Sequence, residues 1–427
     1  MSDKPWGNIC NRVDTCALTG AGAFCAGIPG SEILVNGPLW CYFYALRYLE
    51  HADYHMAERF HGSQPDNSAI VYGSESYLTD TINRILQQDK YPELLFVESS
   101  CSLSLIGDDL NGIVNKLQLP FPHVAMDSGG IVGGFAAGYI KACKTVLDKF
   151  AAAVEQEANT VNLLGLSDFY YNGKADTAEL VRILRKAGYR VNCVPGSGSK
   201  LAALRNIGAA ALNIVCHEEL GLEIAAYLKE RFGTAYISAG LPYGIEGTRK
   251  WLQKINEALP AKAMQAILAE CDEKSAFLQS WNNDSRCSWG SLWFDRAVVA
   301  MPGTAALCLG NALVSEWCDT GSLTIICQNR VEQKDLCKFA DDILFADSDG
   351  DKISACLKEE GTLLLLGSSS ESSIIRHSGN KELISLNMAF PATEQILLTD
   401  IPYMGIKGSA HMLERIWNAF IQQSLRR

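Results

Sequence analysis

Residues 94–101 have the sequence LLFVESSC, in which four consecutive apolar residues are followed by a glutamate, two serines and a cysteine. An apolar run without alternating polar positions is typical of a strand that is buried on both faces of a parallel sheet. Similar runs recur along the chain, separated by stretches with helical periodicity. They lie at 33–35, 69–73, 123–127, 161–166, 190–194, 212–215, 235–238, 297–301, 323–327, 343–346, 362–367 and 383–388. This alternation predicts an α/β protein with mainly parallel sheets and right-handed crossovers.

Two charged, helix-rich passages interrupt the alternation, at 146–159 and at 246–283. We place domain boundaries there, which predicts three Rossmann-like, doubly wound domains. The first covers residues 1–155, the second residues 156–285, and the third residues 286–427, including a closing amphipathic helix at 408–425. A chain of 427 residues is long enough for about three domains of ordinary size.

The composition excludes several classes of protein. With 48% hydrophobic and 20% charged residues, the chain has the balance of a folded globular protein. The net charge of −11 argues against a nucleic-acid partner, which needs a basic surface. The sequence has no apolar run of about 18 residues and no apolar segment near residue 1, so we expect a cytoplasmic protein without a membrane partner. Fifteen cysteines, an odd number, argue against a disulfide framework.

Three of these cysteines are candidate metal ligands. Cys41 and Cys101 each follow a predicted strand of one sheet, where ligands of open α/β sheets bind. Cys16 precedes the glycine-rich segment 18–30, which we expect to be flexible enough to bring it close to them. Soft thiolates suit an iron-sulfur cluster. The spacing includes no CxxC pair, so on spacing alone three unrelated buried cysteines is the simpler interpretation.

A second polar cluster follows the strand at 212–215. It consists of Cys216, His217, Glu218 and Glu219, at a junction where a strand passes into a helix. The amino end of a helix stabilises both thiolates and carboxylates. The cluster is either a set of acidic helix caps or a catalytic site. In a catalytic site His217 is the better candidate for a proton donor or ligand, because histidine titrates near neutral pH.

Glycine-rich runs at 127–138 and 196–200 match neither the GxGxxG nor the GxxxxGK[ST] pattern of nucleotide-binding loops. Small residues spaced along 130–138 favour a helix that packs closely against a neighbour. We therefore predict no ATP site on this chain.

The sequence motifs that flank the cysteines resemble those of a known family. Gly37 and Pro38 come shortly before Cys41, and the word Ile-Gly-Asp-Asp at 106–109 follows Cys101. Together with the intervals between the three cysteines, these words resemble the nitrogenase component 1 superfamily of oxidoreductases. The resemblance continues through the segments 242–248, 389–391 and 402–408, so it covers nearly the whole chain.

The resemblance implies that Cys16, Cys41 and Cys101 bind an iron-sulfur cluster at the interface of two related subunits. The cluster would be of the 4Fe-4S type or an eight-iron type similar to the P-cluster. The partner subunit would be a second copy of this chain or a paralogous component 1 subunit. Electrons of low potential would come from a separate ATP-dependent iron-sulfur reductase, similar to the nitrogenase iron protein, and pass to an unidentified substrate.

The sequence departs from the family's pattern at the second cofactor site. His217 occupies the position of a cofactor-binding cysteine, with Cys216 one residue earlier, and Met404 occupies the position of a cofactor-binding histidine. We therefore expect no iron-molybdenum cofactor and no conventional reduction of dinitrogen. The remaining pattern fits a tetrapyrrole-type reductase, or a β-like subunit whose catalytic site lies on another chain.

Two other interpretations stay open. The protein could be a non-catalytic scaffold for metal-cluster assembly, or a structural relative that binds no cluster. Whether Cys10, Cys25 or Asp14 takes part in ligation is also open at this stage.

Overall fold

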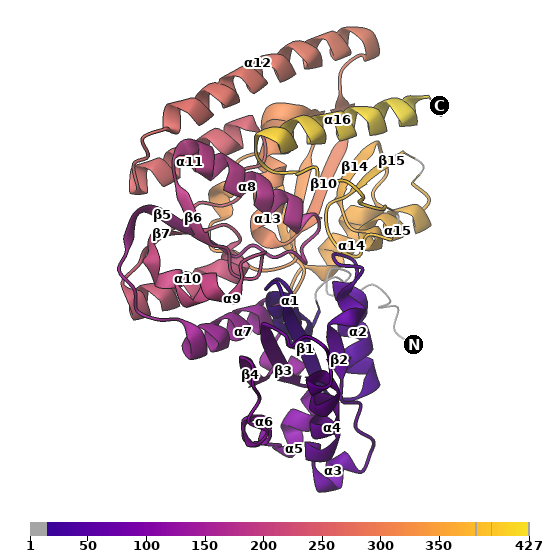
Figure 1. Ribbon diagram of the computed structural model, residues 1–427. Coiled ribbons are helices and arrows are strands. Elements are labelled where there is room, and N and C mark those ends of the chain that lie inside the picture. The colour runs from indigo at the N-terminus through magenta and orange to yellow at the C-terminus, as the bar shows by residue number, and fades with distance from the viewer. Residues whose placement is uncertain (1–14, 381, 394, 426–427) are drawn as a thin grey trace.

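The computed structural model describes residues 15–380, 382–393 and 395–425. Its named strands form three main sheets, and every pairing between them is parallel. This confirms the predicted α/β class with parallel sheets. The predicted domain boundaries near residues 155 and 285 stay predictions. We refer to the three sheets, with the helices that cover them, as the first, second and third units (Figure 1).

The sheets share one kind of strand order, in which the strand that comes first in the chain lies inside the sheet, as in doubly wound folds. The first sheet has the order β2-β1-β3-β4, with β1 (Ser31–Asn36), β2 (Phe60–Gly62), β3 (Leu94–Ser99) and β4 (His123–Asp127). The second has the order β6-β5-β7-β8, with β5 (Glu157–Leu164), β6 (Arg190–Cys193), β7 (Ala210–Val215) and β8 (Ala235–Ser238). The third has the order β13-β12-β10-β14-β15, with β10 (Arg296–Met301), β12 (Leu323–Cys327), β13 (Asp342–Phe345), β14 (Leu363–Gly367) and β15 (Leu383–Asn387). A separate pair joins β9 (Trp293–Phe294) to β11 (Asp319–Thr320).

Helices connect the strands. The first unit contains α1 (Ala17–Ala26), α2 (Leu39–Leu49), α3 (Ala69–Tyr72), α4 (Glu75–Leu86), α5 (Cys101–Ile106), α6 (Leu110–Lys116) and α7 (Phe135–Phe150). The second contains α8 (Gly173–Ala187), α9 (Leu201–Arg205), α10 (Glu218–Phe232), α11 (Ile245–Ala258) and α12 (Met264–Trp289). The third contains α13 (Gly303–Ala312), α14 (Gly350–Lys358), α15 (Ser369–His377) and α16 (Gly405–Ser424).

The segment after Cys16 is not the flexible lead-in that we expected. It forms α1, and every residue of this helix is buried. Its small residues allow α1 and α7 to touch backbone to backbone, because a Cβ atom added at Gly138 would lie 1.8 Å from the carbonyl oxygen of Ala17. Gly138 therefore serves close helix packing, as the sequence suggested, whereas Gly130, Gly133 and Gly134 precede α7 and lie outside the packed helix.

The strand expected at 69–73 is also wrong. Residues Ala69–Tyr72 form the short helix α3, and the side chains of Val71 and Tyr72 are 74% and 86% exposed. An exposed segment has no buried sheet face to join, so its β-branched residues do not impose a strand. The edge of the first sheet is filled instead by β2, which pairs with β1.

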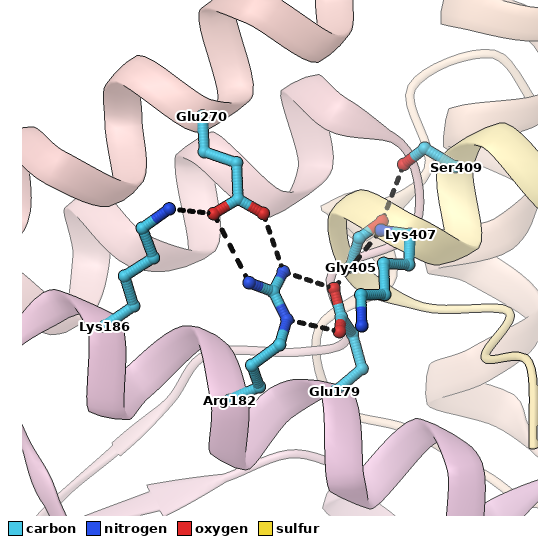
Figure 2. A network of polar contacts seen from close by, with 7 residues as sticks. All are labelled: Glu179, Arg182, Lys186, Glu270, Gly405, Lys407 and Ser409. Atoms are coloured by element: carbon cyan, nitrogen blue, oxygen red, sulfur yellow. Dashed lines mark hydrogen bonds and ion pairs between the residues drawn. The ribbon is translucent and has the colours of Figure 1, made fainter.

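The last helix, α16, packs across the unit boundary. It lies against α8, α11 and α12 as well as against β15, and Figure 1 shows it beside α12 at the end of the molecule opposite the first sheet. Figure 2 shows the polar contacts at this junction. Glu179 on α8 binds Arg182 at 2.7 and 2.8 Å and accepts the backbone N–H of Lys407 at 3.2 Å. Arg182 also binds Glu270 of α12, at 2.9 Å.

Asp176 holds the same junction from inside. Its buried carboxyl accepts the backbone N–H groups of Tyr403, at 2.6 Å, and Met404, at 3.0 Å. Burial raises the pKa of Asp176 to about 7, although these two N–H groups act in the opposite direction. The start of α16 is therefore tied to α8 by a carboxyl that titrates near neutral pH.

Asp176 gives a testable pH dependence. Because its pKa is higher in the folded chain than in the unfolded chain, the unfolded chain loses this proton first as the pH rises. The contribution of Asp176 to the free energy of unfolding is therefore fully present below about pH 4 and is lost as the pH rises to about 7.

Asp176→Asn removes this titration. We expect its stability relative to wild type to rise by up to about 1.4 kcal/mol per pH unit in that range. Urea unfolding at several pH values measures the difference. The exposed Glu230→Gln is the control, and a constant difference between Asp176→Asn and wild type would contradict the assignment.

Candidate functional site

The three cysteines predicted as ligands lie at the carboxyl edge of the first sheet. Cys41 lies in the first turn of α2, which follows β1, and Cys101 begins α5, which follows β3. Cys16 is the N-cap residue of α1 and forms an isolated antiparallel bridge with Gly134. The thiols of Cys41 and Cys101 are partly exposed, and Cys16 is exposed. Strand order places β1 and β3 side by side, so the sheet brings Cys41 and Cys101 together.

Gly130, which follows β4, lies between two of these cysteines. Its N–H donates to Sγ of Cys101 at 2.8 Å. A Cβ atom at this position would lie 3.2 Å from Cβ of Cys16 and 3.4 Å from Sγ of Cys101. A glycine therefore keeps open the space between the two cysteines and supplies a backbone donor to a sulfur, which is a contact that tunes protein-bound metal clusters.

The thiols also interact electrostatically. Burial raises the pKa of Cys41, and the nearby Cys16 and Cys101 raise it further. Three thiolates this close repel each other unless a positively charged group binds them. Within the described ranges, no group of three or more His, Cys, Asp or Glu side chains could hold one metal ion. The ligands of an iron-sulfur cluster bind different iron atoms, so they need not converge on a single point. The all-sulfur donor set, the open space at Gly130 and the N–H donor fit such a cluster.

Glu98, at the end of β3, was not expected at this site. It is completely buried, and burial raises its pKa well above the usual range. One carboxyl oxygen accepts from the hydroxyl of Ser128 at 2.8 Å, and Oε1 has no partner among the residues described. Glu98 also contributes to the raised pKa of Cys41. The only sequence signal was a charged residue at the end of an apolar strand.

Three further residues, Cys10, Asp14 and Cys25, were left open as cluster ligands in the sequence analysis. Cys25 is completely buried within α1, and burial raises the pKa of its thiol well above the usual value. It belongs to the hydrophobic core of the first unit. Cys10 and Asp14 lie outside the described residues.

Large apolar side chains flank the three cysteines and are exposed. Trp40 and Tyr44 of α2 are 64% and 66% exposed, and their rings stack at 5.9 Å. Leu105 of α5 and Ile131 beside Gly130 are 74% and 67% exposed. We call Trp40, Tyr44, Leu105 and Ile131 the apolar rim. Exposed apolar groups gathered around a site are typical of a protein interface.

A cavity between the three units forms the second candidate site. It encloses about 720 Å³, including its opening to solvent, and its walls come from all three units. Aromatic rings dominate, accompanied by three methionine sulfurs and a few polar groups. The aromatic residues are Tyr48, Phe135, Tyr170, Tyr171, Tyr243 and Phe390, the methionines are Met301, Met388 and Met404, and the polar residues include Asp176, His217 and Gln328. The cavity therefore suits a largely apolar molecule with a few polar atoms.

His217 lies in the cavity wall and is only 3% exposed. Its Nδ1 is 3.1 Å from Oε1 of Glu219, and the edge-to-face contact with Tyr170 has a centroid distance of 4.9 Å. The other oxygen of Glu219 accepts from the hydroxyl of Thr304 at 2.6 Å. Burial alone would raise the pKa of Glu219, but His217 and Thr304 hold it below its ordinary value. An ionised Glu219 makes Nδ1 of His217 the donor and leaves Nε2 for a ligand.

The rest of the predicted polar cluster has different roles. Cys216 is completely buried and does not line the cavity, and burial raises the pKa of its thiol. Glu218 crosses to the third unit and accepts from the side chain of Gln333 at 2.6 Å. His217 and Met404, which are 187 residues apart in sequence, meet at the same cavity. Sequence reasoning missed Thr304 and Gln328, because neither belongs to a recognisable motif.

The family model for nitrogenase component 1 type oxidoreductases matches residues 16–421. The chain therefore belongs to this family, and the protein is a nitrogenase-like oxidoreductase or a subunit of one. Among the part of the chain that is described, no helix is long and apolar enough to cross a membrane.

Individual relatives are similar at moderate identity. A light-independent protochlorophyllide reductase subunit from Nostoc punctiforme is 24% identical over 385 residues, which cover 83% of this chain and 72% of the relative. The corresponding subunit from Chlorobium chlorochromatii is 25% identical, with coverage of 86% and 71%. A solved structure of nitrogenase Cp1 at pH 6.5 superposes with a TM-score of 0.78 at 16% identity, covering 97% of this chain and 94% of that one. This last similarity shows the fold.

Proposed function

We propose that the protein is a component 1 reductase subunit that holds an iron-sulfur cluster at a dimer interface. The cluster would receive low-potential electrons from an ATP-dependent iron-sulfur reductase and pass them to a substrate in the central cavity. The observation that carries this proposal is the arrangement of Cys16, Cys41 and Cys101 around Gly130, inside the apolar rim. The bound cluster would supply electrons one at a time.

A dimer would complete the site, because the described part of one chain offers three thiols at this edge. A 4Fe-4S cluster takes four protein ligands, and an eight-iron cluster takes more. A second copy of this chain, or a paralogous subunit, would complete the ligand set and cover the apolar rim. Burial of these side chains would also exclude water from the cluster, which influences its reduction potential.

The central cavity favours a flat, largely apolar substrate. Its aromatic walls provide stacking surfaces, and Gln328 contributes a buried Nε2 without a described partner that could bind a substrate oxygen. The relatives are named as reductases of protochlorophyllide, which supports a tetrapyrrole as the substrate class.

His217 would act as the proton donor in this cavity. When an electron pair is added to a double bond of the substrate, the negative charge that develops must be neutralised by protons. Nε2 of protonated His217 can donate one of them, while Nδ1 stays bound to Glu219. Glu219 stabilises the charged imidazolium and fixes the orientation of the ring, and Thr304 fixes Glu219. Met404 lines the same cavity as His217 with an apolar thioether side chain, which has no proton to donate.

Iron analysis tests the proposal. We expect anaerobically purified and reconstituted wild type to contain about two iron atoms per chain if two identical chains share a 4Fe-4S cluster, or about four if they share an eight-iron cluster. Cys41→Ala should lose this iron and the matching acid-labile sulfide. Cys287→Ala, which removes an exposed cysteine at the end of α12, should keep them.

The outcomes separate the alternatives. A wild type without iron after reconstitution would exclude cluster binding. A cluster that Cys41→Ala leaves unchanged would exclude the predicted ligands. A cluster that is never reduced by a nitrogenase iron protein-like reductase with ATP would instead favour an assembly scaffold.

A further inference from the structure

A polar hollow lies outside both sites described above, between β15, α15 and α16. It encloses about 1170 Å³, including its wide mouth. Two arginines and four side-chain amides line it, and no described lining residue is acidic. These residues are Arg376, Arg415, Asn387, Gln395, Asn418 and Gln422. Two guanidinium groups without a carboxylate among the described lining residues stand out in a chain whose net charge is −11.

Arg415 is held in a fixed position at the wall of the hollow. Its guanidinium lies 4.6 Å from the ring centroid of Tyr403 and donates to Oε1 of Gln395 at 2.9 Å. Its other described contacts are the sulfur of Met388 and the carbonyl oxygen of Asn387, both at 3.5 Å. All of these partners are neutral, so within the described residues the charge of Arg415 is not paired with a carboxylate. A preorganised guanidinium with unused N–H groups is suited to bind an oxyanion in a forked geometry.

The side chain of Asn387 favours phosphate over sulfate as the bound anion. It is the last residue of β15, is only 4% exposed, and lines the hollow, but its Oδ1 has no hydrogen-bond partner among the described residues. A buried acceptor without a partner is costly unless a ligand supplies a donor. A fully ionised sulfate has only acceptor oxygens. Near neutral pH, inorganic phosphate carries negative oxygens for the arginine and keeps an O–H for Asn387. A phosphate monoester keeps an O–H only as the monoanion, which forms below its second pKa of about 6.

We propose that this hollow binds a phosphate group, either as inorganic phosphate or as a small phosphate monoester. The site lies at the carboxyl end of β15, where open α/β sheets bind their ligands. Arg415 binds the negative oxygens, Asn387 accepts the phosphate O–H, and Arg376, Asn418 and Gln422 complete the rim. Because none of these residues touches the cysteine site, the proposal stands apart from cluster binding.

Calorimetric titration of the full chain with inorganic phosphate, at low ionic strength, tests the site. We expect saturable binding to one site per chain. Arg415→Gln should weaken it at least about tenfold, because it removes a charged hydrogen-bonding partner. Gln422→Glu should weaken it as well by adding a negative charge at the rim. Gln422 is exposed on α16, so this second variant tests the site even if Arg415→Gln fails to fold. Arg330→Gln changes an exposed arginine that pairs with Asp347, and it should bind phosphate like wild type.

Two further probes define the ligand. Sulfate, which lacks the O–H at neutral pH, should bind at least about tenfold more weakly than phosphate if Oδ1 of Asn387 accepts a hydrogen bond from the ligand. Glycerol 2-phosphate separates the two sources of the group, because tighter binding than inorganic phosphate indicates a monoester and weaker binding indicates free phosphate. Absence of saturable phosphate binding up to about 10 mM would overturn the proposal. Equal affinities for phosphate and sulfate, or unchanged affinity in both Arg415→Gln and Gln422→Glu, would overturn it as well.

Discussion

Alanine in place of Gly138 is expected to destabilise the first unit by about 3 kcal/mol or more, at the upper end of the cost of overpacking. The added Cβ would lie 1.8 Å from the carbonyl oxygen and 2.5 Å from the carbonyl carbon of Ala17. Both atoms belong to backbone, so no side chain can rotate away and α1 must separate from α7. The start of α1 also carries Cys16, so the displacement would disturb the candidate cluster site. The loss in the free energy of unfolding is measured by urea unfolding, from the first transition on the unfolding curve.

Gly247→Ala is the matched control for this experiment. Gly247 also lies in a helix, α11, but a Cβ atom there would have its nearest neighbour 3.9 Å away. Alanine should leave stability unchanged or raise it by about 0.5–1 kcal/mol, because glycine loses more conformational freedom on folding. Equal stabilities of Gly138→Ala and wild type would show that the two helices are not packed as closely as described.

Alanine in place of His217 is expected to lower the turnover number of the reconstituted enzyme by about 10²–10⁴-fold, the usual contribution of a positioned general acid. The histidine is the group in the cavity wall whose ring is held by a buried carboxylate, at 3.1 Å. Electron delivery to the cluster should stay normal, because His217 does not touch the cysteines. Substrate reduction, measured with protochlorophyllide as the first probe, is compared with the rate at which the reductase is oxidised.

Two variants make this result specific. Glu219→Gln keeps a hydrogen-bond acceptor but removes the charge that stabilises the imidazolium, so we expect a loss of about 10–100-fold and a shifted pH profile. His377→Ala changes an exposed histidine on α15 and should have wild-type turnover. Unchanged turnover and an unchanged pH profile in His217→Ala would exclude the proposed proton donor.

Much of the fold follows from local pattern. The apolar run before Cys101 is β3, and the runs at 212–215 and 297–301 correspond to strands of the second and third sheets, because strands buried on both faces leave a strong signal. The prediction for the segment after Cys16 was wrong, because glycine favours flexibility in isolation but allows close helix packing when a partner helix is available. The partner is more than one hundred residues away, so no local pattern reveals it.

In the candidate sites, too, some residues are predictable from local sequence and others only from the folded structure. The sequence predicts Cys16, Cys41 and Cys101 as ligands through short motifs and a family resemblance, and His217 as a catalytic candidate through its place after a strand; these roles stay predictions. It favoured His217 over Cys216 on side-chain chemistry alone, and only the fold shows that both residues are buried and that His217 is the one that lines the cavity. Glu98, Gly130 and Thr304 acquire their roles from neighbours across the fold. Gln395 and Arg415 likewise face a common hollow only after β15 and α16 have packed.

The docking of α16 on α8 also bears on how the protein is made. The carboxyl groups of Asp176 and Glu179 accept hydrogen bonds from backbone N–H groups near the start of α16. These donors belong to Tyr403, Met404 and Lys407, which are synthesised 227 or 228 residues later. The three cysteines, by contrast, all lie at or before residue 101 and are synthesised at least 302 residues before Tyr403. The thiols are therefore available for metal well before the cavity can close. A nascent chain would have to be protected from premature loading or oxidation until its last helix has emerged.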